Sequence, residues 1–206
     1  MKTILCFGDS NTWGYDSRND TRFSWEKRYP GILSKMMGEG YHVIENGLCG
    51  RTTKYESELE PFINGMKAAE FCREVHMPLD YVVLMLGTND CKDMYEAEVE
   101  DICEGIKDIG HCFFQDGTQI VLVAPPVMRC LSESPFFKEF GYRAEEKSGK
   151  LKKAYKGLAE KEGWLFLDAD MFVRASDYDR IHLDREGNRI LAEAISIVIK
   201  DKENEK

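Results

Sequence analysis

Ser10 is the residue that first points to chemistry. It stands in the segment 8–14, Gly-Asp-Ser-Asn-Thr-Trp-Gly, directly after a short apolar run, in a turn that should leave its hydroxyl exposed. A hydroxyl is a poor nucleophile near neutral pH and needs a base within hydrogen-bond distance, with a third group to orient that base. A serine in this setting indicates acyl transfer through a covalent intermediate, provided that a histidine and an acid lie nearby.

His182 is the histidine best placed to act as that base. The other three lie inside element patterns, His42 in a strand pattern and His76 and His111 in helix patterns, whereas His182 lies in a loop after a strand. Asp179 precedes His182 by three residues, so one loop turn can present both side chains to the same edge, with the aspartate fixing the imidazole tautomer. Asp177 is a competing acid, but its spacing to His182 is less apt.

Two further loops offer hydrogen-bond donors for the oxyanion that forms in acyl transfer. Asn89 follows an apolar run and offers its side-chain amide, and Gly50 follows another and offers its backbone N–H. The N–H of Ser10 is the third candidate donor. Each such donor is worth roughly 3–4 kcal/mol of transition-state stabilisation.

Every one of these residues also has a purely structural interpretation. Ser10 resembles an ordinary turn or cap serine, the pair Asp179 and His182 can cap the last helix, Asn89 can stabilise a turn, and Gly50 can serve only its backbone angles. Taken alone, the segment Gly-Asp-Ser is a weak motif. The four segments together, each placed directly after a predicted strand, favour a catalytic site.

The elements that must position these residues alternate along the chain. Short apolar runs predict buried strands at 3–7, 41–45, 81–86, 119–124 and 164–168. Apolar residues at helical spacing predict helices after Pro30, over about 65–76, through 99–113, around 151–158 and at 190–198, the last with an N-cap near Asp184.

This alternation predicts an α/β fold, a three-layer α/β/α sandwich with a parallel sheet covered on both faces. The loops at the carboxyl ends of such strands gather at one edge, which is where the candidate residues fall. We expect one domain over 1–206, with a charged tail at about 200–206 that frays. We predict that residues 125–147 form a long excursion after the fourth strand, which serves either as a pocket wall or as a subunit contact.

The composition excludes several kinds of partner. A net charge of −9 and a pI near 5.1 disfavour nucleic acid, because that affinity depends on clustered Lys and Arg. The longest apolar runs fall short of the roughly 20 residues of a membrane helix, so we expect no membrane insertion. The seven cysteines form no Cys-x-x-Cys pair and no leader segment precedes the first strand, which favours free thiols and a cytoplasmic location.

The four polar segments resemble the sequence blocks of the SGNH, or GDSL, hydrolase superfamily. The segments 4–10, 12–14, 43–45, 50–53 and 85–90 are similar to its bacterial arylesterase and acyltransferase branch, and the likeness covers nearly the whole chain. The resemblance implies that Ser10, His182 and Asp179 form a catalytic triad and that Ser10, Gly50 and Asn89 form the oxyanion hole. It also implies a flavodoxin-like sheet of order 2-1-3-4-5, frequent homo-oligomers, and neither a metal nor a cofactor.

Three positions depart from the family pattern. Asn11 replaces the usual leucine after the nucleophile, Cys49 stands where the arylesterases usually carry a serine, and Arg180 replaces a glycine beside the histidine block. Asn11 need not touch the reacting atoms, whereas Arg180 either affects substrate choice or points to water. As substrate-binding candidates we name Asp9, Trp13, Arg180 and Ile181, with the reservation that Trp13 serves equally well as a core residue.

The sequence therefore predicts a serine esterase that hydrolyses small, short-chain carboxylic esters. Transfer of the acyl group to an alcohol and removal of acetyl groups from a carbohydrate use the same residues and stay open as alternatives. A binding module that keeps the fold without catalysis is a third alternative, because fold does not determine function. The presence of all five family positions argues against this last one.

Overall fold

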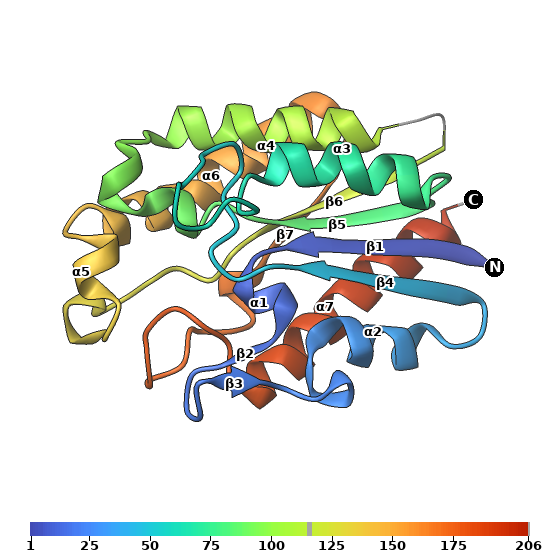
Figure 1. The fold of residues 1–206 in the computed structure, drawn as a ribbon. Helices are drawn as coiled ribbons and strands as arrows, with labels where there is room; N and C mark the ends of the chain where they lie inside the picture. Colours follow the sequence, from blue (N-terminus) through green and yellow to red (C-terminus); the bar gives the residue numbers. More distant parts are fainter. Residues whose placement is uncertain (115–116, 206) are drawn as a thin grey trace.

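A parallel sheet forms the centre of the computed structural model, which describes residues 1–114 and 117–205 (Figure 1). Its strands are β1 (Lys2–Gly8), β4 (Tyr41–Gly47), β5 (Tyr81–Met85), β6 (Gln119–Ala124) and β7 (Leu165–Asp168). They lie in the order β4-β1-β5-β6-β7. Counted along the chain this is 2-1-3-4-5, so the predicted α/β fold and strand order are confirmed.

The three central strands β1, β5 and β6 are largely buried because helices cover both faces of the sheet, whereas the edge strands β4 and β7 are mostly half-buried. All five residues of β5 are buried, as are all but the first residue of β6, which explains why these strands have continuous apolar sequences without polar alternation. Helices α3 (Gly65–His76), α4 (Val99–Phe113) and α6 (Ala144–Glu162) lie on one face, and α2 (Tyr29–Met37) and α7 (Arg185–Asn204) lie on the other (Figure 1). Each face has its own cluster of buried apolar side chains.

Helix α7 begins where the sequence predicts and ends later than expected. The Asp184 side chain accepts a hydrogen bond from the N–H of Gly187, which caps the helix. The expectation that the tail frays from residue 200 is wrong for 200–204, which are helical. The reason is that Glu203 forms an ion pair with Lys2 and accepts a hydrogen bond from the hydroxyl of Tyr81, so the last turn is tied to the sheet. Residue 206 lies outside the described residues.

At the carboxyl edge of the sheet, a short helix packs directly on the strand ends. Helix α1 (Ser10–Trp13) follows β1 and ends at Gly14. A Cβ atom on Gly47, the last residue of β4, would lie 2.1 Å from the backbone nitrogen of Trp13, so only glycine allows α1 to approach β4 this closely. Gly8 is level with both Gly47 and Met85. The residues that follow β1, β4 and β5 therefore start at the same level along the strand direction, at the carboxyl edge of the sheet.

Several small elements near this edge were not predicted. A hairpin of β2 (Tyr15–Asp16) and β3 (Thr21–Arg22) follows α1. The excursion after β6 contains a short 3-10 helix, η4 (Leu131–Glu133), and helix α5 (Phe137–Phe140), and it ends at Ala144, where α6 begins. The remaining 3-10 helices are η1 (Trp25–Lys27), η2 (Asn89–Cys91), η3 (Asp93–Tyr95) and η5 (Ala169–Met171).

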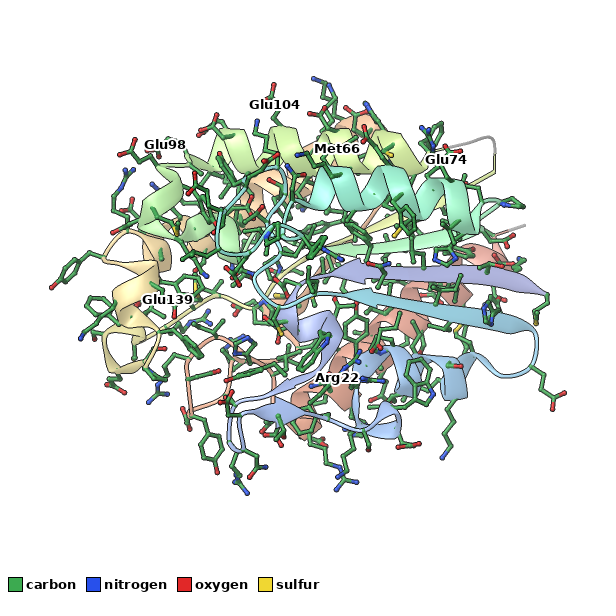
Figure 2. All side chains as sticks on the ribbon, in the orientation of Figure 1. Arg22, Met66, Glu74, Glu98, Glu104 and Glu139 are labelled. Atoms are coloured by element: carbon green, nitrogen blue, oxygen red, sulfur yellow. The ribbon has the colours of Figure 1, made fainter. Side chains whose placement is uncertain are left out.

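Acidic side chains project from the outer surface of α3 and α4. Figure 2 shows Glu74, Glu98 and Glu104 projecting outward from α3 and from the start and middle of α4, away from the sheet. None of the helices in the described part of the chain combines the length and apolarity needed to cross a membrane. All seven cysteines lie in the described part and are free thiols, as expected.

Candidate active site

Ser10, His182 and Asp179 lie together at the carboxyl edge of the sheet. Ser10 Oγ lies 2.7 Å from His182 Nε2, and Asp179 Oδ2 lies 2.5 Å from His182 Nδ1. Each of the three residues is at most 7% exposed. Ser10 is therefore buried, not exposed as the turn suggested, because the walls of a cavity surround its hydroxyl. The arrangement places a base on the hydroxyl and a carboxylate on the other ring nitrogen of that base.

Asp179 is held in place by its own loop. Its Oδ1 atom accepts hydrogen bonds from the backbone N–H groups of Ile181 and His182, at 3.1 and 3.0 Å, and from the hydroxyl of Ser176. Burial by itself raises the pKa of Asp179, but the hydrogen bonds and charge of His182 and the N–H of Ile181 outweigh it and hold the pKa below its usual value. Asp179 is therefore ionised at neutral pH.

The competing acid Asp177 lies outside this arrangement. Its carboxylate is 91% exposed and forms an ion pair with Arg180. Arg180 has a positive φ of 64°, which turns the chain sharply between Asp179 and His182. The structure therefore places Asp179, and not Asp177, against the histidine.

The turn that carries Ser10 is fixed at two points. The Asp9 carboxylate accepts a hydrogen bond from the N–H of Asn11 at 2.9 Å and so caps α1. The side-chain oxygen of Asn11 accepts a hydrogen bond from the N–H of Leu183 at 2.9 Å, which ties the serine turn to the histidine loop 172 residues away. We did not predict this role for Asn11. The signal was an amide in place of an aliphatic side chain at a buried position, since buried amides require partners.

Gly50 and Asn89 lie beside Ser10, where the resemblance expected oxyanion donors. Gly50 has a φ of 78°, a left-handed conformation that glycine adopts without strain. The side-chain nitrogen of Asn89 donates to the carbonyl oxygen of Arg51 at 3.1 Å, which orients the amide. All three residues line the same cavity.

Asp90, directly after Asn89, holds the loop that carries Gly50. Its carboxylate accepts hydrogen bonds from the N–H and the hydroxyl of Thr53. Complete burial raises the pKa of Asp90 from 3.8 to about 6, although the hydrogen bonds from Thr53 oppose this rise. Between about pH 4 and pH 6, the folded protein consequently keeps a proton on Asp90 that the unfolded chain releases.

This proton gives a prediction for the pH dependence of stability. Because the folded state binds more protons than the unfolded state in this window, Asp90 should destabilise the fold increasingly as pH rises from 4 to 7, by about 3 kcal/mol in total. The variant Asp90→Asn lacks this titration, so its unfolding free energy relative to wild type should rise with pH. Urea unfolding at pH 4, 5.5 and 7 measures the difference. A difference that stays constant with pH would contradict the prediction, and the exposed substitution Asp108→Asn serves as the control.

The cavity above Ser10 has a volume of about 300 Å³. Besides Ser10, Gly50, Asn89, Ile181 and His182, its lining contains Tyr15, Asp20, Cys49, Glu60, Lys92, Phe136, Glu139 and Phe140. Phe136, Glu139 and Phe140 come from the excursion after β6, which therefore forms a cavity wall. Sequence reasoning located this excursion but did not identify which of its residues face the site.

Of the four substrate-binding candidates, the structure places one on the cavity wall and three elsewhere. Ile181 lines the cavity, but Asp9, Trp13 and Arg180 are not among the described residues that line it. Asp9 is 1% exposed and lies behind Ser10 as a helix cap. The Trp13 ring packs against the guanidinium of Arg22, and Arg180 forms ion pairs with Glu133 and Asp177. The structure therefore does not place these three residues on the wall of the cavity, and substrate contact through them stays an untested expectation.

Two aromatic rings flank His182. The ring centre of Tyr15 lies 4.4 Å from that of the imidazole, and the ring of Phe136 lies edge-on at 6.0 Å. The Tyr15 hydroxyl donates to Asp20 at 2.8 Å across the β2–β3 hairpin. These contacts hold the imidazole plane and shield it from water, which strengthens its polar interactions. Tyr15 is a functional candidate that sequence reasoning missed, since a tyrosine in a short hairpin carries no motif.

No group of three or more His, Cys, Asp or Glu side chains is arranged to hold a metal ion within residues 1–114 and 117–205. The sheet order and the meeting of a serine, a histidine and an aspartate at its carboxyl edge define a class, the SGNH-type carboxylic ester hydrolases, and the chain is an enzyme of this class. More closely, it belongs to the GDSL-like lipase/acylhydrolase family, whose sequence model matches residues 6–190.

Solved structures agree with this assignment over almost the full chain. A carbohydrate acetylesterase family member from Sinorhizobium meliloti is 33% identical, with a TM-score of 0.91, and the match covers 97% of this chain and 98% of that chain. The aryl esterase of M. smegmatis is 31% identical, with a TM-score of 0.91 and coverage of 98% and 99%. A putative arylesterase from Agrobacterium tumefaciens is 33% identical, with a TM-score of 0.88 and the same coverage. A search of curated proteins found no match.

Proposed function

We propose that the chain hydrolyses short-chain carboxylic esters through an acyl-enzyme on Ser10. The observation that carries this proposal is the 2.7 Å contact between Ser10 Oγ and His182 Nε2, with Asp179 on the other ring nitrogen. His182 takes the hydroxyl proton as Ser10 Oγ attacks the ester carbonyl, and Asp179 stabilises the imidazolium that results. His182 then gives the proton to the departing alcohol, which leaves the acyl group on Ser10.

In the second half of the reaction, water takes the place of the alcohol. His182 removes a proton from the water, whose oxygen attacks the acyl carbon, and the carboxylic acid is released as the proton returns to Ser10 Oγ. In both halves of the reaction we propose that the N–H groups of Ser10 and Gly50 and the Asn89 amide donate hydrogen bonds to the negative oxygen of the tetrahedral intermediate. This assignment is supported by their common position on the cavity wall.

The dimensions of the cavity support a short acyl chain. About 300 Å³ is at the lower end of the range for small-molecule pockets. Phe136, Phe140 and Ile181 form apolar parts of its wall, and Phe140 and Ile181 are each at most 3% exposed. An acyl chain that exceeds this volume would have to displace these packed side chains or extend into solvent.

Removal of acetyl groups from a carbohydrate is a second candidate function. Two matching structures from Sinorhizobium meliloti are named as carbohydrate acetylesterases, and one of them is 31% identical with a TM-score of 0.92. The carboxylates of Asp20, Glu60 and Glu139 line the cavity and are suitable acceptors for sugar hydroxyls. Acyl transfer to an alcohol would use the same catalytic residues.

A panel of esters tests the proposed function. We expect 4-nitrophenyl acetate to be hydrolysed with a kcat/KM at least about tenfold higher than the octanoate, because the longer chain does not fit the cavity. Acetylated xylose and glucose, assayed by acetate release, test the second candidate. No hydrolysis of any panel member above the rate of Ser10→Ala would remove both.

The setting of the enzyme is also a proposal. We propose a single domain over 1–206 that acts on small molecules in the cytoplasm, without nucleic-acid partners. Its seven free thiols support a reducing compartment, and its net charge of −9 argues against binding polyanions.

A further inference from the structure

Arg51 is a buried arginine directly after Gly50, and the mechanism above does not use it. The residue is 5% exposed. Its Nη1 atom donates to the carbonyl oxygen of Gly8 at 2.9 Å and to that of Asn46 at 2.6 Å. Gly8 is the last residue of β1 and Asn46 is the penultimate residue of β4. One guanidinium therefore joins the ends of two neighbouring strands at the carboxyl edge of the sheet, directly below the candidate active site.

The third connection of Arg51 is made by its backbone. Its carbonyl oxygen accepts the hydrogen bond from the Asn89 side chain, and Asn89 belongs to the loop that follows β5. Arg51 thus contacts the ends of β1 and β4 and the loop after β5, the three segments that carry Ser10, Gly50 and Asn89. Another side chain that bridges loops here, Asn11, links Ser10 to the histidine loop instead.

The surroundings of the Arg51 guanidinium disfavour a charged group. Burial lowers the pKa of Arg51 to about 10, so it remains a cation at neutral pH. Its Cζ atom lies over the ring of Phe7, 4.5 Å from the ring centre, and its Nε is a buried donor without a hydrogen-bond partner in the described structure. Cys72 and the buried Asp9 oppose this lowering of the Arg51 pKa without cancelling it. Well-packed apolar residues often replace such buried charges without loss of stability, so stability alone does not explain an arginine here.

We propose that Arg51 is a positioning residue for the oxyanion hole. Its planar guanidinium fixes the β1 and β4 ends, and hence Gly50, while its carbonyl orients the Asn89 amide. This inference rests on the proposed function, because it assumes that Gly50 and Asn89 stabilise the oxyanion. Donors must be correctly placed before the oxyanion forms, so the consequence of losing Arg51 is a defect in transition-state stabilisation and not in substrate binding.

The variants Arg51→Met and Arg51→Lys test the proposal on a short-chain ester. Methionine keeps the apolar stem but has no donor, and we expect kcat to fall about 10²-fold with KM changed by less than about threefold, as for loss of an oxyanion donor. Lysine keeps the charge but not the planar fork, and we expect a fall of about tenfold. Binding of phenylboronic acid, which forms a tetrahedral adduct, should weaken in proportion to kcat/KM.

Arg28→Met is the matched control, because Arg28 is also a buried arginine, 9% exposed, but its guanidinium pairs with Glu45 on β4. It should keep kcat within about threefold of wild type even if its melting temperature falls as far as that of Arg51→Met. If Arg51→Met does not fold, Arg51→Lys carries the test. A folded Arg51 variant with wild-type kcat and boronate affinity overturns the proposal.

A double-mutant cycle separates positioning from a general structural effect. Adding Arg51→Lys to Asn89→Ala should cost clearly less than adding it to wild type, since the amide that Arg51 orients is already absent. Fully additive losses overturn the role through Asn89. If Ser10→Ala retains wild-type activity, the proposed function itself is wrong. This result is independent of how the Arg51 variants behave.

Discussion

Replacing Ser10 by alanine is expected to lower kcat/KM for short-chain esters by a factor of about 10⁴ or more, because no acyl-enzyme forms without the nucleophile. The remaining rate would come from binding and from the oxyanion donors alone. The substitution removes one atom at a site where Oγ contacts His182 and faces the cavity. Little packing is therefore lost, and the melting temperature should remain within a few degrees of wild type.

A fluorophosphonate probe identifies the reacting serine directly. The wild-type protein should be labelled at Ser10 and the alanine variant should not be labelled. Ser196→Ala is a matched control, since Ser196 is also buried, at 5% exposure, but lies on α7 with its hydroxyl on the carbonyl of Glu193. Labelling at another residue, or equal ester hydrolysis by Ser10→Ala and wild type, would refute the nucleophile assignment.

Replacing Asp179 by asparagine is expected to lower kcat by about 10³ to 10⁴ at neutral pH. The amide oxygen can still accept the backbone N–H groups of Ile181 and His182 that now bond to Oδ1. The amide nitrogen would then face His182 Nδ1 as a donor, which forces the proton of the ring onto Nε2. In that tautomer His182 cannot accept the proton of Ser10, so the loss affects kcat while the structure is retained.

Asp177→Asn is the control for this variant. Asp177 lies two residues away, is 91% exposed, and pairs only with Arg180 among the described side chains, so its loss should change kcat by less than about threefold. Steady-state kinetics of both variants at pH 7 and pH 9 measure the effect. A large loss of activity in Asp177→Asn, with the activity of Asp179→Asn unchanged, would show that Asp177 and not Asp179 is the acid of the triad.

Much of the fold was predictable because the central strands β5 and β6 are apolar on both faces. The runs at 81–86 and 119–124 have no polar alternation, which restricts them to the interior of a covered parallel sheet. Helix α7 was located by its apolar spacing and by the capping aspartate at 184. Its end was not predictable, because the charged residues after 200 look solvated, whereas Glu203 is held by Lys2 and Tyr81 from distant strands.

The central residues of the site were predictable because they follow strand ends and carry distinctive chemistry. The cavity wall was not, since Tyr15, Phe136 and Phe140 are ordinary aromatic residues whose role depends on where a hairpin and an excursion fold back. Arg180 illustrates the opposite case. From sequence a large cation beside the histidine could either affect substrate choice or point to water, whereas in the structure it has a positive φ and pairs with Glu133.

The hydrogen bond between Ser10 and His182 joins residues 172 positions apart, and Asn11 makes a second bond across the same interval. Contacts of such high contact order form only after most of the chain has closed. During synthesis the serine turn leaves the ribosome 172 residues before its base, so a nascent chain carries the nucleophile long before it can be activated. Ester hydrolysis would then report completed folding, and refolding followed by activity should lag behind refolding followed by helix content.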